Sequence, residues 1–479
     1  MDINELGPII NAGSIAELML AWMQKSPDRQ IKNKSDLQAY LAADIAKIDN
    51  TISKQLNQVI HHEEYKKLES AWRGLAMLAY QPKYLSDLKL KLLNVTWEEL
   101  HKDVSYVLSF EQSKLFKKVY SDEYDSPGGE PYGLLIGDYS VRIQGDYSPK
   151  DLETLRGVSL VAASAFSPFI AGLHPQSLKM DSFYEVSPRI NFIKLFETED
   201  YREWTSFRKN FESRYVGLVA PRFLLRKPFR VNKNKEFGFC FNEDKTEYLW
   251  GNPCYAFASV VINSYARTSW FNEMRDYNPE TNVGGVVRYS PLHSAIQDTY
   301  SDFDTLFSTE THIDNEMEWQ LGQAGILAMS HIKQLGAPVF YNSFSAYKCK
   351  VYSNNQVAEN NEKISCEMQY ILHVSRFMHY VKVIMREKIG AMLTADELKV
   401  YINNWLIKYV ASNEVDAGLV NRFPLRSVSV ELLPVTGSPG AYQCILYLVP
   451  RIYMDSFRAS VNLSTVFSLS PTQQLSTVG

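Results

Sequence analysis

The sequence has no long hydrophobic run and few cysteines. None of its apolar stretches approaches the roughly 18 residues that a membrane-spanning helix needs, and its first residues lack the basic and apolar regions of a secretory signal. We therefore expect a cytosolic chain that does not insert into a membrane. The five cysteines are widely spaced without a C-x-x-C pair, which argues against a zinc site or a disulfide framework and predicts reduced core thiols. They are Cys240, Cys254, Cys349, Cys366 and Cys444.

Motifs that hold phosphates or activate nucleophiles are also absent. The chain contains no G-x-x-x-x-G-K-[ST], G-x-G-x-x-G, H-E-x-x-H or G-x-S-x-G pattern. Its Gly128-Gly129 pair precedes a predicted strand, whereas phosphate-binding loops lie between a strand and the N-terminus of a helix. We therefore predict no catalytic residue, no cofactor and no metal, and we do not expect an enzyme.

Charge of one sign is not in excess. Lys and Arg number 50 against 54 Asp and Glu, and the net charge of -4 does not favour binding to nucleic acid or to an anionic membrane. With 45% hydrophobic and 22% charged residues the composition is that of a globular protein. A chain of 479 residues has room for two or three domains.

Two helical patterns open the chain. Residues 15–25 and 35–59 carry apolar side chains at three- and four-residue spacing, and Ser35 followed by Asp36 resembles a helix start. The longer helix has few obvious partners in the sequence, so it either packs on its own domain or pairs with a helix of another subunit. Its apolar stripe consists of Leu37, Leu41, Ile45, Ile48, Ile52 and Leu56.

Helix and strand patterns alternate through the middle of the chain. Residues 61–82 predict a helix, residues 88–95 (LKLKLLNV) alternate like a strand, and a strand and a helix follow at 132–139 and 149–165. This alternation is typical of an α/β or mixed α+β fold. In the helix at 61–82 we expect five large side chains to point inward, namely Tyr65, Leu68, Trp72, Leu75 and Leu78.

The last part of the chain combines a buried helix with three strands. A polar, asparagine-rich stretch at 353–363 is predicted to be a linker, and apolar residues then recur every three or four positions through 364–390. Three strand-like runs follow at 427–433, 442–449 and 458–467. An uncovered strand at the edge of such a sheet is a template for pairing with another chain.

Two clusters of metal-ligand residue types also have structural interpretations. His61, His62, Glu63 and Glu64 are adjacent and point to different sides of a helix, which favours a solvated helix start. The alternating polar residues of 310–318 would line one face of a strand and could gather a hard cation. An acidic solvent face or an intersubunit patch is the simpler interpretation of that segment.

Other charged residues lie inside apolar runs. His373 and His379 are six residues apart, on different faces of a helix, and are predicted to be structural. Five arginines are each expected to have a carboxylate or carbonyl partner, in this chain or in another, because an unpaired buried charge is costly. They are Arg73, Arg214, Arg222, Arg226 and Arg376.

Several stretches, in the same order along the chain, resemble the large contractile-sheath subunit of the bacterial type VI secretion system, the TssC/VipB/EvpB family. The resemblance spans most of the chain and departs from the family pattern in residues 282–353 and after Ser468. The stretches are HHEEYKKLESAWRGL (61–75), SDEYDSPGGEPYGLLIGDY (121–139), RYVGLVAPRFLLRKPF (214–229), YLWGNPCYAFA (248–258), YILHVSRFMHYVKVIMREKIG (370–390) and NRFPLRSVSVELLPVTGSPGAYQCILYLVP (421–450).

The resemblance implies a structural, non-enzymatic protein with a multi-domain, mixed α/β, phage-tail-sheath-like fold. It implies an N-terminal helical segment (1–60) that pairs with a small sheath subunit, a middle or outer domain (61–360) and a tube-proximal domain (361–479) open to strand addition. The helix-pairing candidates are Leu37, Leu41, Ile45, Ile48 and Ile52. The strand-exchange candidates are Val428, Val430, Leu432, Gln443, Ile445, Leu446 and Leu448.

The partners implied by the resemblance are those of a secretion machine. They are the small sheath subunit (TssB/VipA-like), neighbouring sheath heterodimers, an Hcp-like inner tube, a membrane-anchored baseplate and a ClpV-like AAA+ unfoldase that acts through the small subunit. The implied location is the bacterial cytoplasm. The alternatives are a sheath of a related phage-tail-like injection particle and, less favoured, an enzyme of unknown mechanism.

Overall fold

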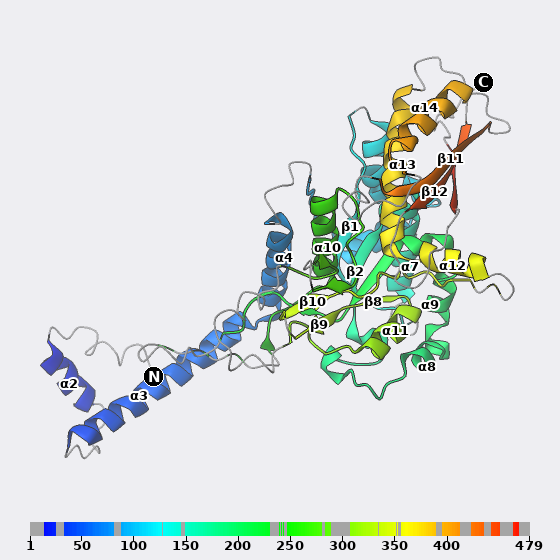
Figure 1. The fold of residues 1–479 in the computed structure, drawn as a ribbon. Coiled ribbons are helices and arrows are strands. Elements are labelled where there is room, and N and C mark those ends of the chain that lie inside the picture. The colour runs from blue at the N-terminus through cyan, green and yellow to red at the C-terminus, as the bar shows by residue number, and fades with distance from the viewer. Residues whose placement is uncertain are drawn as a thin grey trace. The chain divides into compact units, whose positions relative to one another are not determined.

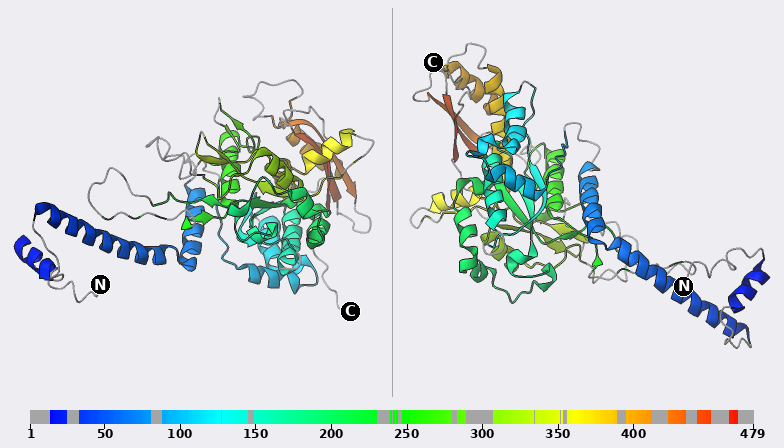
Figure 2. Two further views of the ribbon diagram at one scale, coloured as in Figure 1. Left: turned by 90° about the horizontal axis from the view of Figure 1, so that it is seen from below. Right: turned by 180° about the vertical axis from the view of Figure 1, so that it is seen from behind.

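The computed structural model divides into two compact units, residues 1–66 with 228–248, and residues 67–227 with 249–479. The ribbon is shown in Figure 1, with further views in Figure 2. The structure describes residues 14–24, 33–80, 88–126, 128–144, 149–229, 239, 241, 243, 247–279, 283–288, 307–333, 335–350, 352, 356–388, 395–411, 423–434, 442–450 and 463–468.

The first unit contains the helices α2 (Ile15–Gln24) and α3 (Lys34–Ile60). Both predicted helices are therefore present. The longer one starts slightly earlier than predicted from Ser35, because Asn33 rather than Ser35 precedes its first turn. The backbone N–H of Asn33 donates to the Asp36 carboxylate at 3.1 Å, which satisfies a group that the helix itself leaves unpaired.

The second unit is built on a parallel sheet with the strand order β1-β2-β3-β8. Its strands are β1 (Leu135–Val141), β2 (Phe169–Leu173), β3 (Val216–Ala220) and β8 (Ile326–Ala328). Parallel strands need crossover connections, and α7 (Pro149–Ser164) supplies the one between β1 and β2. The α/β alternation predicted from the sequence is confirmed here.

Different helices cover the two faces of this sheet. Side chains that alternate along a strand point to opposite faces, so Ala171 and Leu218 pack in a cluster with α7. Ile170 and Val219 pack in a second cluster, with α10 (Cys254–Thr268). The strands are therefore apolar on both faces, as a doubly covered parallel sheet requires.

Further helices and strands complete the unit. The helices are α4 (Glu63–Ala79), which begins in the first unit, α5 (Trp97–Ser105), α6 (Lys114–Phe116), α8 (Phe192–Phe196), α9 (Arg202–Phe207), α11 (Asn315–Gln323), α12 (Gln356–Ser365), α13 (Met368–Lys388) and α14 (Ala395–Ile407). The strands are β4 (Phe223–Leu224), β5 (Trp250–Gly251), β6 (Tyr277–Asn278), β7 (Val283–Gly284), β9 (Ser330–Ile332), β10 (Ala337–Val339), β11 (Leu425–Pro434), β12 (Tyr442–Pro450) and β13 (Leu463–Ser468).

Helix α4 packs side by side with α10 (Figure 1). A Cβ atom on Gly74 of α4 would lie 2.4 Å from the ring of Tyr255 of α10, so this close approach requires glycine. Leu78 is buried in the same contact region. The prediction that Tyr65, Leu68 and Trp72 point inward is wrong, because these three side chains are 45%, 58% and 63% exposed.

Helix α13 joins three hydrophobic clusters. Ile371 packs in the cluster with α7, while Met368 and Leu372 pack in the cluster with α10. Farther along the helix, Phe377 and Met385 pack in a third cluster, beneath the C-terminal strands. The buried helix predicted within 364–390 is confirmed. It packs against both the parallel sheet and the C-terminal strands.

Two other predictions of local structure are corrected. Residues 88–95 have the alternation of a strand but form no backbone pairing with any described strand. The alternation of apolar and polar residues therefore did not suffice to predict a strand here. The predicted linker at 353–363 is largely helix α12, in which Glu359 and Lys363 form an ion pair of 2.8 Å across one turn.

In the described part of the chain, no helix is long and apolar enough to cross a membrane.

His373 and His379 are both buried within α13, as expected of structural histidines. His379 Nε2 lies 3.0 Å from the carbonyl oxygen of Phe166, and His373 is stacked against Trp270. Burial lowers the pKa of His373 to about 4. Burial, assisted by the charge of Arg376, lowers the pKa of His379 to about 3. Both rings are therefore neutral in the folded protein near neutral pH.

These pKa shifts predict that the fold loses stability in mild acid. An unfolded histidine binds a proton below about pH 6.5, and the folded chain resists doing so until about pH 4 or 3. The free energy of unfolding should therefore fall from about pH 6.5 downward, by up to ~1.4 kcal/mol per pH unit for each histidine. Urea unfolding at several pH values measures this slope, and His373→Phe should make it shallower. An equal slope in both proteins would contradict the assignment.

Candidate assembly interfaces

The chain ends in a three-stranded antiparallel sheet with the strand order β11-β12-β13. Val428 is opposite Leu448 and Val430 is opposite Leu446, while Leu446 is also opposite Thr465 on the other side. The three strands expected from the sequence are confirmed, and the third is described over Leu463–Ser468. Residues 458–462 lie outside the described part of the chain.

One face of this sheet is buried against α13 and α14 (Figures 1 and 2). Val430, Leu446 and Leu448 are at most 4% exposed, and they pack with Phe377 and Ile402. The other face of β11 is solvent-exposed and largely polar, with Ser427, Ser429 and Glu431 on it. The alternation of apolar and polar residues along 427–432 of β11 thus fixes which side of the sheet faces the helices.

The seven strand-exchange candidates lie on two neighbouring strands, β11 and β12. Those on β11 lie on a strand that has one strand neighbour, and those on β12 lie on the central strand, which has two. A bridge from Val410 and two hydrogen bonds cover only the start of β11, at Leu425. Beyond it, the outer edge of β11 faces no other described strand. Val428 and Leu432 are half-buried, and the side chain of Gln443 lies outside the described residues.

Helix α3 presents an apolar stripe that the described part of the chain does not bury. None of its described residues is buried, and Leu41, Ile45, Ile48 and Ile52 are each 37–57% exposed. Leu37 is partly covered. Within the first unit, Trp22 Nε1 of α2 donates a hydrogen bond to the carboxylate of Asp44 at 3.0 Å.

The acidic segment 310–318 is not a solvent face. Glu310 is buried, and its carboxylate accepts hydrogen bonds from Arg222 at 2.6 and 2.7 Å and from the Ser182 hydroxyl at 2.7 Å. Glu318 is buried too, and burial raises its pKa to about 7. Asp314 accepts a hydrogen bond from the backbone N–H of Met317 and so caps α11. Glu310 and Glu318 are therefore buried in the fold, Glu310 as the partner of Arg222, whereas Glu316 is exposed.

The solvated helix start predicted at 61–64 is only partly right. His62, Glu63 and Glu64 are exposed, but the side chain of His61 is 6% exposed and its Nε2 lies 2.9 Å from the buried carboxylate of Glu243. This contact lies within the first unit and connects residues 182 positions apart in sequence. Among the described residues, no group of three or more histidine, cysteine, aspartate or glutamate side chains is arranged to hold a metal ion.

The arginines inside apolar runs have partners within the chain. Four pair with carboxylates: Arg73 and Arg226 with Glu69, Arg214 with Glu362, and Arg222 with Glu310. Arg376 donates to the hydroxyl of Tyr380 at 2.7 Å and lies over the same ring. Each of the five arginines therefore has a partner within its own chain.

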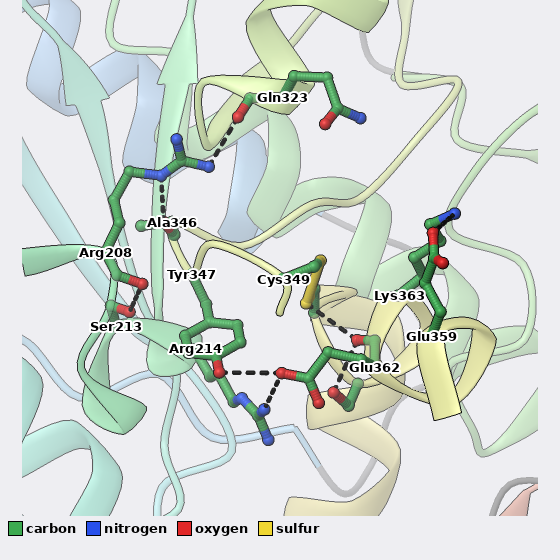
Figure 3. The surroundings of a disulfide bond; sticks show 12 residues. Arg208, Ser213, Arg214, Gln323, Ala346, Tyr347, Cys349, Glu359, Glu362 and Lys363 are labelled. Carbon is green, nitrogen blue, oxygen red and sulfur yellow. Dashed lines mark hydrogen bonds and ion pairs between the residues drawn. A yellow bond between two sulfur atoms is a disulfide. The ribbon is translucent and has the colours of Figure 1, made fainter. Parts of the chain in front are cut away.

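Two of the cysteines do not fit the expectation of reduced thiols. Cys349 and Cys366 form a disulfide, shown with its surroundings in Figure 3. Beside it, Glu362 accepts hydrogen bonds from Arg214 at 3.0 Å and from the Tyr347 hydroxyl at 2.9 Å. Cys254 and Cys444 are free and buried, as expected, and Cys240 lies outside the described residues. Because Cys349 and Cys366 are 17 positions apart in the sequence, their spacing did not predict that they would form a disulfide.

Comparison with known proteins assigns the chain to a class. Residues 42–347 match the EvpB tail sheath N-terminal domain, and residues 357–467 match the EvpB tail sheath gpW/gp25-like domain. The first region contains the parallel sheet and the second contains α13 and the terminal sheet. This is the organisation of a tail sheath protein. More specifically, the chain belongs to the VipB/EvpB family.

One relative matches most of this chain. The type VI secretion system sheath protein TssC1 of Pseudomonas aeruginosa is 32% identical over 428 residues, which are 88% of this chain and 84% of the relative. A chain in a cryo-EM structure of the anti-feeding prophage baseplate matches 66% of this chain and 62% of its own length, at 10% identity and a TM-score of 0.31.

Proposed function

We propose that this chain is the large structural subunit of a contractile sheath used in type VI secretion. The observation that carries the proposal is the match to both tail sheath domains, together with 32% identity to a type VI secretion sheath protein over 88% of the chain. The sheath would surround an inner tube and contract to propel it. In this role the chain does no chemistry of its own, and its function lies in its contacts with other subunits.

The terminal sheet supplies the link between neighbouring subunits in this proposal. A strand from a neighbour adds to the outer edge of β11, and β12 holds that edge in place through its pairing with Val428 and Val430. Each ladder hydrogen bond contributes only ~0.5–1.5 kcal/mol net, but several form at once along one strand. A head-to-tail link of this kind does not close on itself, and it therefore builds a helical polymer.

Helix α3 supplies the contact with the small sheath subunit in this proposal. Its stripe of Leu41, Ile45, Ile48 and Ile52 is exposed in the single chain, and exposed apolar surfaces of this kind mark interaction sites. An amphipathic helix of the small subunit buries the stripe. Residues 1–60 are then the pairing segment, 61–360 the middle or outer domain and 361–479 the tube-proximal domain.

The remaining contacts follow from the same role. The assembled sheath docks on a membrane-anchored baseplate in the bacterial cytoplasm and surrounds an Hcp-like tube. A ClpV-like unfoldase recycles the contracted sheath through the small subunit. Contraction releases free energy stored in the extended assembly, so it needs no hydrolysis in this chain.

Co-expression with the small sheath protein encoded nearby tests the proposal directly. Negative-stain microscopy of the lysate should show ribbed hollow cylinders, because the two subunits suffice for a polymer in this account. The large chain expressed alone should form none. A soluble monomer in the presence of the partner would count against the proposed function.

Leu446→Pro should abolish the cylinders while leaving the two-subunit complex intact. Leu446 is buried and paired on both sides, so proline removes a ladder donor from the centre of the terminal sheet. Leu446→Met keeps the donor and most of the volume, and it should still give cylinders. Microscopy and affinity co-purification separate the two effects, and normal cylinders from the proline variant would disprove the role of this sheet.

Ile45→Glu combined with Ile48→Glu should prevent the two-subunit complex. Both side chains are exposed in the single chain, so the free energy of unfolding of that chain should change by less than about 1 kcal/mol. In the complex two charges would be buried without partners, which is strongly unfavourable. The matched control is Lys47→Glu on the same helix. Co-purification of the double variant at the wild-type ratio would rule out this helix as the pairing surface.

A further inference from the structure

The bond between Cys349 and Cys366 lies where the two sheath regions of the chain meet. The match to the tail sheath N-terminal domain ends at residue 347, and the match to the gpW/gp25-like domain covers residues 357–467. Cys349 thus lies just after the first region, and Cys366 lies in the second, between α12 and α13. The bond spans 17 positions and encloses α12, so it ties the two regions together beside their connection in the chain.

Backbone contacts hold the two cysteines close together without the bond. The backbone N–H of Ser345 donates to the carbonyl oxygen of Cys366 at 2.8 Å, and the backbone N–H of Met368 donates to that of Ser343 at 2.6 Å. The Cα atoms of Cys349 and Cys366 are 6.3 Å apart, a distance that a disulfide spans without movement of the backbone. The two thiols of a reduced chain therefore stay within reach of each other.

Glu362, on α12, suits both the oxidised and the reduced pair. Its carboxylate accepts hydrogen bonds from Arg214 at 3.0 Å and from the Tyr347 hydroxyl at 2.9 Å, and these contacts hold α12 beside the bond (Figure 3). Its backbone carbonyl oxygen lies 3.0 Å from Sγ of Cys366. A thiol at Cys366 thus has a hydrogen-bond acceptor, and the surroundings accommodate two thiols as well as a disulfide.

The two sulfur atoms differ in access and in nearby charge. Cys349 is half-buried, and its neighbours in sequence, Lys348 and Lys350, are both exposed. Positive charge beside a thiol favours the thiolate, which is the form that attacks a disulfide. Cys366 is 1% exposed and precedes the buried Glu367. Cys349 is therefore the sulfur that meets a reagent from solution, and Cys366 is the one that completes the exchange.

We propose that Cys349 and Cys366 form a reversible redox link between the two sheath regions. In the oxidising direction, the Cys349 thiolate attacks a low-molecular-weight disulfide, bonds to one of its sulfur atoms and expels the other as a thiolate. The Cys366 thiol then loses its proton to solvent and attacks Sγ of Cys349, which expels the second small thiolate. Two cysteine thiols are thus oxidised while one small disulfide is reduced to two thiols. An excess of the small thiol drives the same steps backwards.

The oxidised and reduced chains differ in what joins the two regions at this point. In the reduced chain the contacts of Glu362 and the backbone hydrogen bonds of Ser345 and Met368 remain, and all of them are lost when the chain unfolds. In the oxidised chain the bond persists and restricts the unfolded chain, which raises resistance to unfolding. This inference does not depend on the proposed function.

Mixtures of reduced and oxidised glutathione test the redox link in the full-length chain. After free thiols are trapped under denaturing conditions, peptide mass spectrometry should show Cys349 and Cys366 passing from thiols to a disulfide as the share of oxidised glutathione rises. Cys254 and Cys444 are 0% exposed and should remain thiols throughout. A pair that stays linked in millimolar reduced glutathione, or a pair that never links, would overturn the inference.

Single serine variants test the order of the two steps. Cys366→Ser should accumulate a mixed disulfide between Cys349 and glutathione, because the second attack cannot follow. Cys349→Ser should form at least about tenfold less mixed disulfide at Cys366, which is the less accessible sulfur. Equal amounts in the two variants would disprove the assignment of Cys349 as the attacking thiolate.

Urea unfolding tests what the link does. The oxidised wild-type chain should unfold at a higher urea concentration than the reduced wild-type chain. Cys349→Ser is the matched control, and it should unfold at the same urea concentration in oxidising and reducing buffer. Equal midpoints for the oxidised and reduced wild-type chains would contradict the role of the link in joining the two regions.

Discussion

The second unit depends on the burial of helix α13. Its first turns lie in both clusters that cover the parallel sheet, and its last turns lie under the terminal sheet. Near its end, Arg386 donates to the carbonyl oxygen of Tyr124 at 2.8 Å, and the ammonium of Lys382 lies 4.1 Å from the centre of the Tyr120 ring. Because so many buried contacts share one helix, the terminal sheet cannot move independently of the parallel sheet without exposing apolar surface.

This coupling changes how the domains are understood. In sequence, α13 belongs to the region that matches the gpW/gp25-like domain. In space, Met368 and Ile371 complete the core of the preceding region. The two regions are thus separate in the family description but share a core in the folded chain. A force applied to the terminal sheet of such a subunit would be transmitted through α13 to the parallel sheet.

Sequence patterns predicted the elements whose periodicity is strong. Helix α13, helix α3 and the three terminal strands were expected, because apolar spacing alone specifies them. The burial of Glu310 was not, because its partner Arg222 lies 88 positions away. The exposed face of α4 was also missed, since the close approach at Gly74 decides which side packs. For the candidate interfaces, the sequence indicated the strands and the helix stripe, but only the topology shows that β12 is central and that β11 and β13 are the edge strands of the described sheet.

The exposed face of β11 has a consequence for how such proteins change over time. A ladder of backbone hydrogen bonds is chemically the same whatever side chains flank it, so the proposed link through this edge would constrain mainly the inward residues such as Val430. Ser427, Ser429 and Glu431 point away from the core and touch little of it. In the proposed assembly, the outer surface of this sheet can therefore change in sequence without loss of the connection between subunits.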